Sequence, residues 1–189
     1  MRILVSVCLV LLSFTSINFG LAFFSDPTES TVKFTAKHSF GGPVTGMLEG
    51  FSVAVVLSED ERLEKVEARI DSNSINTGHS IRDRRLRRTA FFDSLTHPFI
   101  VFKADENQSL SGQTLTGVLN VKGQSQELSL PVRFELTKGK LKRDYSIKAS
   151  LNNYAISRKD YGMSAWGFFI DDEVIIDIDL LLRPLRVIK

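Results

Sequence analysis

The sequence predicts an all-β domain of about eight antiparallel strands. Apolar and polar residues alternate along most of the chain, which is the period-two pattern of strands that bury one face. Eight such strands in one domain fit either a closed barrel or a sandwich of two sheets, and alternation does not distinguish between them. Clusters of turn-forming residues separate the alternating segments at Ser58-Glu59-Asp60, Glu106-Asn107-Gln108, Lys122-Gly123-Gln124 and Lys138-Gly139-Lys140.

The first half of the chain holds four of the expected strands. In the first of them, Val32, Phe34 and Ala36 fall on one face, while lysines and threonines fall on the other. The fourth follows Pro98, which suits a strand start because proline has no backbone N–H to pair. The expected strands of this half are residues 31–38, 47–57, 65–74 and 99–104.

The second half repeats the pattern. Its clearest segment is an unbroken alternation from Leu128 to Leu136, in which every second residue is apolar. The last segment alternates in the same way from Val174 to Arg183. The expected strands of this half are residues 115–121, 128–136, 145–151 and 174–183.

The segment HSIRDRRLRRTAFFD, residues 79–93, interrupts the alternation between the third and fourth strands. Ser80 is a suitable N-cap, so we predict a short helical insert that reaches about Phe92. Ile81 and Leu86 would face inward, and Phe91-Phe92 would lie near one mouth of the fold. The arginines expected on the outer face are Arg84, Arg85 and Arg88. A second insert, rich in aromatic residues, is expected at 159–172.

The N-terminus has the pattern of a secretory signal peptide. Arg2 is the only charge before Asp26, an apolar run follows it, and Gly20-Leu21-Ala22 offers small residues at a cleavage site. We therefore expect a leader over residues 1–22 and a single mature domain over residues 23–189. An uncleaved anchor helix is the alternative, because an apolar run of this length can span a bilayer.

Composition limits the function of the mature domain. Cleavage removes Cys8, the only cysteine, so the mature chain can form no disulfide and no cysteine-ligated metal site. The chain has 24 Lys and Arg against 22 Asp and Glu, and loss of Arg2 leaves 23 against 22. A nearly neutral, exported domain argues against nucleic-acid binding, which usually needs a strongly basic face.

The inward face contains several small residues between bulky ones. Ala36, Ala68, Gly117 and Ala149 are in phase with the large apolar residues of their strands. They could open a continuous slot, because an eight-stranded barrel has an interior just wide enough for one slender ligand. They could equally be the small partners of a large–small packing pattern in a filled core.

Several segments together resemble the YceI-like family, over nearly all of the mature chain. No one of them is specific, but their order and spacing are. They are Ser74-Ile75-Asn76-Thr77-Gly78 with Arg82-Asp83, Leu86-Arg87 and Phe91-Phe92-Asp93; His97-Pro98-Phe99-Ile100-Val101-Phe102; residues 115–123; and Arg158-Lys159-Asp160-Tyr161-Gly162-Met163 with Asp172-Glu173-Val174. Asn120 and Gln124-Ser125-Gln126 depart from the family pattern at positions expected to lie away from the interior.

The resemblance implies an eight-stranded antiparallel lipocalin-like β-barrel, with the helical insert between strands 3 and 4. It also implies a periplasmic carrier that holds a long-chain isoprenoid or similar amphiphilic lipid in the barrel, without catalysis, metal or cofactor. The residues expected to contact the tail are Phe34, Ala36, Ala68, Ile70, Phe102, Leu119, Phe134, Ile147 and Ile176; those expected at the mouth are His38, Arg82 and Phe91.

Other functions remain open from the residues alone. His38 could act as an acid or base in a lipid-acting enzyme, although the chain has no G-x-S-x-G nucleophile elbow and no recognisable metal-ligand spacing. The Arg82–Arg88 helix could be a solvated surface, an interaction module, or a site for an anionic head group or membrane surface. Arg82 and Asp83 could also form a structural ion pair. A monomer and a homodimer are both compatible with the sequence.

Overall fold

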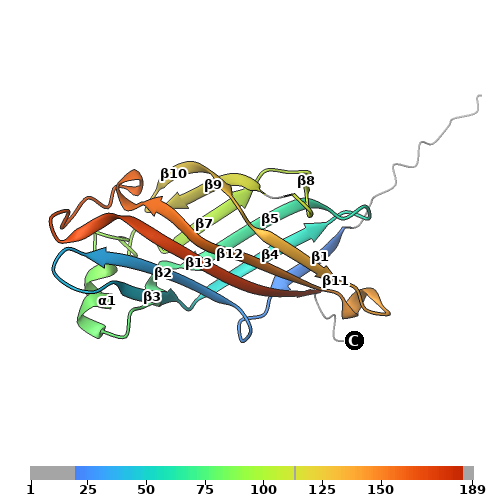
Figure 1. The fold of residues 1–189 in the computed structure, drawn as a ribbon, viewed down its shortest axis with the longest axis horizontal. Coiled ribbons are helices and arrows are strands. Elements are labelled where there is room, and N and C mark those ends of the chain that lie inside the picture. Colours follow the sequence, from blue (N-terminus) through green and yellow to red (C-terminus); the bar gives the residue numbers. More distant parts are fainter. Residues whose placement is uncertain (1–19, 113, 185–189) are drawn as a thin grey trace, which may run out of the picture.

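The computed structural model describes residues 20–112 and 114–184, and Figure 1 shows their fold as an elongated, rolled antiparallel sheet. One short helix, α1 (Ser80–Leu86), lies at one end. Three 3₁₀ turns occur at Ser72–Ser74, Lys142–Asp144 and Arg158–Tyr161. The strands are β1 (Leu21–Ser25), β2 (Thr31–His38), β3 (Val44–Leu48), β4 (Phe51–Leu57), β5 (Arg62–Asp71), β6 (Ile75–Asn76), β7 (Phe99–Ala104), β8 (Gln108–Ser109), β9 (Leu115–Val121), β10 (Gln124–Leu130), β11 (Arg133–Thr137), β12 (Ser146–Ser157) and β13 (Ile170–Pro184).

The all-β, antiparallel prediction is confirmed, but the eight-stranded closed barrel is wrong. The described residues form one sheet of 13 strands in the order β10-β9-β7-β5-β4-β1-β13-β2-β3-β6. β12 branches from β13 and carries β11, while β8 pairs with β5. No ladder joins β10 to β12 among the described residues, so the hydrogen-bonded path does not return on itself.

The strand count differs because two expected strands are each divided and three short strands, β1, β6 and β8, were not expected. The expected strand at residues 47–57 breaks at Glu49-Gly50, between β3 and β4. The alternation from Leu128 to Leu136 breaks at Pro131-Val132, because Pro131 has no N–H to donate to a ladder. β10 then pairs with β9, and β11 pairs with β12. Alternation predicts which face of the sheet a side chain lies on, but it does not predict which strand its own strand pairs with.

The helical insert lies where the sequence predicted it but is shorter. α1 ends at Leu86 rather than near Phe92. Beyond it the chain turns back, and the N–H of Phe92 donates to the carbonyl of Leu86 at 3.0 Å. Asp93 then adopts a left-handed conformation, with φ of 48°. These turns bury Phe91 and carry the chain into β7.

The sheet packs its inner side chains into two buried clusters. One contains Phe23, Leu63, Ile147 and Leu182, all with at most 1% exposure, on strands β1, β5, β12 and β13. The other contains Ile75 and Tyr161 with residues of β2, β3, β7 and β9. The period-two alternation of each strand thus directs its apolar side chains to the inner face of the sheet, where they form these two clusters.

The predicted leader falls mostly outside the described residues. Residues 1–19 are not described, and Leu21 and Ala22 are the first residues of β1, paired with Leu57 and Val56 of β4. Phe23, the first residue of the expected mature chain, is fully buried. Within the described ranges, no helix has the length and apolarity needed to cross a membrane.

Gly117 does not open a slot; it allows two strands to pack closely. A Cβ at this position would lie 2.4 Å from the carbonyl oxygen of Lys103 and 2.8 Å from the Phe102 ring. We expect Gly117→Ala to reduce the free energy of unfolding by about 1–3 kcal/mol, because β7 and β9 must move apart. The matched control is Gly42→Ala, where no atom lies within 4 Å of the added Cβ. Equal urea midpoints for the two variants would contradict this account.

Candidate functional site: an apolar cavity with an arginine-lined mouth

The rolled sheet encloses a cavity of about 580 Å³. Its walls come from the inner faces of most of the long strands, and α1 and the segment between β12 and β13 border one end. Apolar side chains make up nearly all of the lining. The volume lies within the range of about 300–1,000 Å³ that is usual for small-molecule sites.

All but one of the sequence-predicted site residues line this cavity. Ile147 is the exception: it is fully buried in the cluster that contains Phe23 and Leu63, so its expected place on the cavity wall is wrong. Ala36, Ala68 and Ala149, three of the four small inward residues, also line the wall. The predicted residues that do line it are Phe34, Ala36, His38, Ala68, Ile70, Arg82, Phe91, Phe102, Leu119, Phe134 and Ile176.

Aromatic residues form a rim at the mouth. The rings of Phe40 and Phe169 lie 5.9 Å apart, and those of Trp166 and Phe169 lie 6.0 Å apart. Phe40 and Phe168 are 85% and 90% exposed. Trp166 and Phe169 line the cavity and are about half exposed, so the apolar wall continues outward onto the protein surface.

Basic residues from α1 and β2 complete the mouth. Arg82 and Arg85 of α1 line the cavity with His79, which precedes the helix, and with His38 at the end of β2. The Arg85 guanidinium lies 4.8 Å from the centre of the Trp166 ring, a cation–π contact that joins the helix to the aromatic rim. Ile81, expected to face inward, also lines the mouth but remains 59% exposed.

Arg82 and Asp83 are not paired with each other; both are bonded to Thr77. The Arg82 guanidinium donates to the Thr77 hydroxyl at 2.7 Å and to the Thr77 carbonyl at 2.9 Å. The Asp83 carboxylate accepts from the Thr77 N–H and hydroxyl at 2.9 and 2.5 Å. The Arg82 side chain is therefore held in one position at the mouth.

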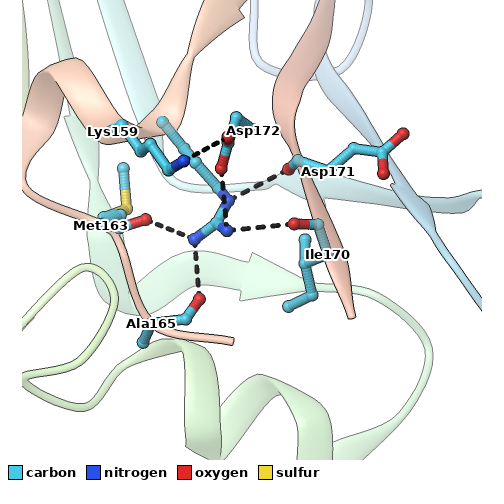
Figure 2. A network of polar contacts seen from close by, with 7 residues as sticks. Lys159, Met163, Ala165, Ile170, Asp171 and Asp172 are labelled. Atoms are coloured by element: carbon cyan, nitrogen blue, oxygen red, sulfur yellow. Dashed lines mark hydrogen bonds and ion pairs between the residues drawn. The ribbon is translucent and has the colours of Figure 1, made fainter. Parts of the chain in front are cut away.

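Arg158 fixes the loop that carries the aromatic rim. The residue is only 4% exposed, and its partners Met163, Ala165, Ile170, Asp171 and Asp172 are labelled in Figure 2. The guanidinium donates to the carbonyls of Met163, Ala165, Ile170 and Asp171, and it lies 3.2 Å from the Asp172 carboxylate. A buried cation is tolerated here because every side of its donor fork meets an acceptor.

The remaining polar groups on the wall are sparse and carry no formal charge. Burial raises the pKa of Tyr161 to about 12, with smaller contributions from Asp160 and Tyr154, so its hydroxyl stays neutral at physiological pH. Ser150 and Tyr154 are the other hydroxyl groups of the lining. In the described part of the chain, no group of three or more His, Cys, Asp or Glu side chains is placed to hold a metal ion.

The sequence pattern did not predict the role of Arg158 or the place of His79 and Arg85 on the cavity wall. Arg158 lies in one of the segments that resemble the YceI-like family. An arginine that follows a strand is usually exposed, so the sequence does not predict that this side chain is buried. His79 was expected beside the insert and Arg85 on its outer face, where contact with an anionic head group or membrane surface was one alternative. Their position depends on where α1 packs against the end of the sheet, which alternation does not encode.

Comparison with protein families confirms the resemblance seen in the sequence. A family model described as "YceI-like domain" matches residues 23–182. A UPF0312 protein of Staphylococcus aureus is 28% identical over 140 residues, which cover 74% of this chain and 80% of that protein. A UPF0312 protein of Pectobacterium carotovorum is 27% identical over 104 residues, 54% of each chain.

Solved structures share the fold at low sequence identity. BcnA of Burkholderia cenocepacia superposes with a TM-score of 0.68 at 21% identity, covering 83% of this chain and 98% of BcnA. A polyisoprenoid-binding domain from Saccharophagus degradans superposes with a TM-score of 0.68 at 18% identity, and the match covers 87% of this chain and 99% of that domain. The YceI protein of Campylobacter jejuni superposes with a TM-score of 0.64 at 23% identity, and the match covers 76% of this chain and 85% of that protein.

Replacement of Arg158 tests the support of the rim. We expect Arg158→Met to lower the free energy of unfolding by at least about 2–3 kcal/mol, because several carbonyls lose their donor in a buried site. Lys159→Met is the matched control: Lys159 lies 2.6 Å from the same Asp172 carboxylate but is 52% exposed, so its loss should cost under about 1 kcal/mol. Chemical denaturation measures both, and similar losses would contradict the role given to Arg158.

Proposed function

We propose that this chain, which belongs to the YceI-like family, binds a long-chain isoprenoid or similar amphiphilic lipid with its tail inside the cavity. The observation that carries the proposal is an apolar cavity of about 580 Å³ that continues to an open aromatic mouth. An amphiphile needs an apolar channel for its tail and an exit for its head. The cavity offers both.

Tail burial alone supplies useful affinity. Each methylene removed from water contributes about 0.8 kcal/mol, so ten of them give about 8 kcal/mol before ordering costs. The loss of translational and conformational freedom on binding removes part of this gain. A long, slender chain is therefore a better ligand for this site than a short or polar molecule.

The structural neighbours support the ligand class. The Saccharophagus degradans domain is described as polyisoprenoid-binding, and it shares this fold over 87% of the chain. At 18% identity the shared feature is the fold itself. The proposal for this protein therefore rests on its own cavity, and the neighbour indicates which kind of lipid to test first.

The site is suited to holding a ligand rather than to chemistry. His38 lies at the end of β2, opposite Ile170 of β13, on a lining that contains no Asp or Glu to orient an imidazole. A His-based acid–base pair usually needs such a partner. The family and the polyisoprenoid-binding neighbour also point to a binding protein.

We further infer a periplasmic carrier that contacts a membrane surface transiently. Export is supported by the apolar N-terminal leader of residues 1–22. Membrane contact is supported by the exposed Phe40, Trp166 and Phe168 at the mouth, since aromatic residues favour the bilayer interface. Arg84 of α1 and Arg88, just beyond the end of α1, are exposed near the mouth arginines along the chain and could meet anionic lipids.

Obstruction of the cavity tests the proposed function. Ala68→Phe adds a ring to the cavity wall and should reduce binding of a polyprenol at least about tenfold, because it displaces several methylenes of the tail. Ala155→Phe is the matched control, since Ala155 is an exposed residue of β12 that does not line the cavity. Unchanged affinity in Ala68→Phe, with the fold intact by circular dichroism, would eliminate the cavity as the binding site.

Replacement of His38 separates a carrier from an enzyme. In a carrier, His38→Ala should change lipid affinity by less than about tenfold, the most that one neutral hydrogen bond contributes. The lipid extracted from the wild-type protein should also be chemically unchanged. The control is His97→Ala, because His97 does not line the cavity. Turnover of a lipid that falls about 10²-fold or more in His38→Ala alone would instead favour the enzyme.

The N-terminus of the exported protein tests the localisation. After expression of the full chain in a Gram-negative host, intact mass and N-terminal sequencing of the periplasmic protein should place the first residue at Phe23. Recovery of the full-length chain in the membrane fraction would show instead that the leader is retained as an anchor.

A further inference from the structure

The charged residues on the cavity wall are all of one sign. Among the residues that the structure describes, Arg82, Arg85 and Arg158 are the only charged side chains in the lining, and no Asp, Glu or Lys takes part in it. Two histidines, His38 and His79, border the same mouth. The described chain as a whole is nearly balanced in charge, so this segregation is a property of the cavity mouth.

The three arginines differ in how their charge is compensated. Arg158 is buried and lies 3.2 Å from the Asp172 carboxylate, with its other donors on carbonyls. Neither Arg82 nor Arg85 is within 4.0 Å of a carboxylate in the described residues. Asp83 is the nearest acid along the helix, but its carboxylate is bonded to Thr77. Arg82 and Arg85 therefore present positive charge that no carboxylate pairs.

Arg82 is also preorganised. Its two hydrogen bonds to Thr77 fix the guanidinium beside the cavity, while Arg85 rests against Trp166 at 4.8 Å. A guanidinium held in place loses less conformational entropy on binding than a free side chain. Both groups lie where the head of a ligand would emerge if its tail occupied the cavity.

We propose that Arg82 and Arg85 form a subsite for an anionic head group, so that the cavity selects amphiphiles with a phosphate or carboxylate head over neutral alcohols of the same chain. This inference rests on the proposed function, because it assigns the head of a lipid whose tail is in the cavity. Guanidinium groups bind such oxyanions through charge-assisted hydrogen bonds, and the surrounding apolar wall strengthens those bonds.

The test compares two ligands with one tail. Geranylgeranyl phosphate and geranylgeraniol are titrated into delipidated protein by calorimetry, with inorganic phosphate as a third ligand. The fluorescence of Trp166, the only tryptophan in the chain, reports whether the head reaches the mouth. We expect geranylgeranyl phosphate to bind about 10- to 100-fold more tightly than geranylgeraniol, and this difference in affinity should become smaller as salt is added.

Variants assign the preference to the two arginines. Arg82→Gln with Arg85→Gln should abolish the preference, because geranylgeranyl phosphate loses its charge-assisted hydrogen bonds while geranylgeraniol has no charge to pair and loses less affinity. The matched control is Arg84→Gln with Arg88→Gln, which should keep the preference, because Arg84 of α1 and Arg88 just beyond its end are exposed and outside the lining. If the double variant at Arg82 and Arg85 does not fold, Arg85→Gln alone, at an exposed position, should still reduce the preference.

The outcomes distinguish the subsite from the proposed function. Equal affinity of the wild type for both lipids, or loss of the preference in the control pair, overturns the subsite while leaving tail binding intact. Inorganic phosphate that binds as tightly as the lipid phosphate would show a free-anion site and also overturns it. Failure of both lipids to bind removes the proposed function, and the subsite with it.

Discussion

The structure depends on an apolar inner surface that its own side chains do not fill. Around the cavity of about 580 Å³, the apolar atoms of the wall have no packing partners on one side and lose those van der Waals contacts. Water gains little there because it finds few polar partners. An apolar ligand relieves this cost directly, and the elongated sheet provides a space whose shape suits a chain.

The open end adds a second constraint, because a mouth must stay ordered without being packed. The buried Arg158 meets this need by joining two carbonyls of the loop between β12 and β13, those of Met163 and Ala165, to two carbonyls and one carboxylate at the start of β13. The same loop holds Trp166 and Phe169 at the rim, where Trp166 meets Arg85 of α1. Helix and loop are thus connected around the opening, and the polar groups of the site are concentrated at that end of an apolar channel.

Alternation was sufficient to predict which side chains face inward, and insufficient to predict how the strands are joined. Phe34, Ala68 and Phe102 line the cavity as expected, since side-chain direction depends only on the period of two. Ile147 has the correct direction, but it lies where Phe23 and Leu182 fill the interior, and that depends on β1, which the sequence assigned in part to the leader. The break at Pro131 follows from its missing N–H, but the new partners of β10 and β11 depend on pairing between distant segments, which alternation does not report.

The central claim, that the cavity holds one amphiphilic lipid, is tested most directly by native mass spectrometry of the wild-type protein purified without detergent. We predict a stoichiometric adduct that dissociates on solvent extraction and is recovered as an intact lipid with a long apolar chain. A mass equal to that of the polypeptide alone, with no lipid in the extract and none taken up from added polyprenol or lipid phosphate, would contradict the account.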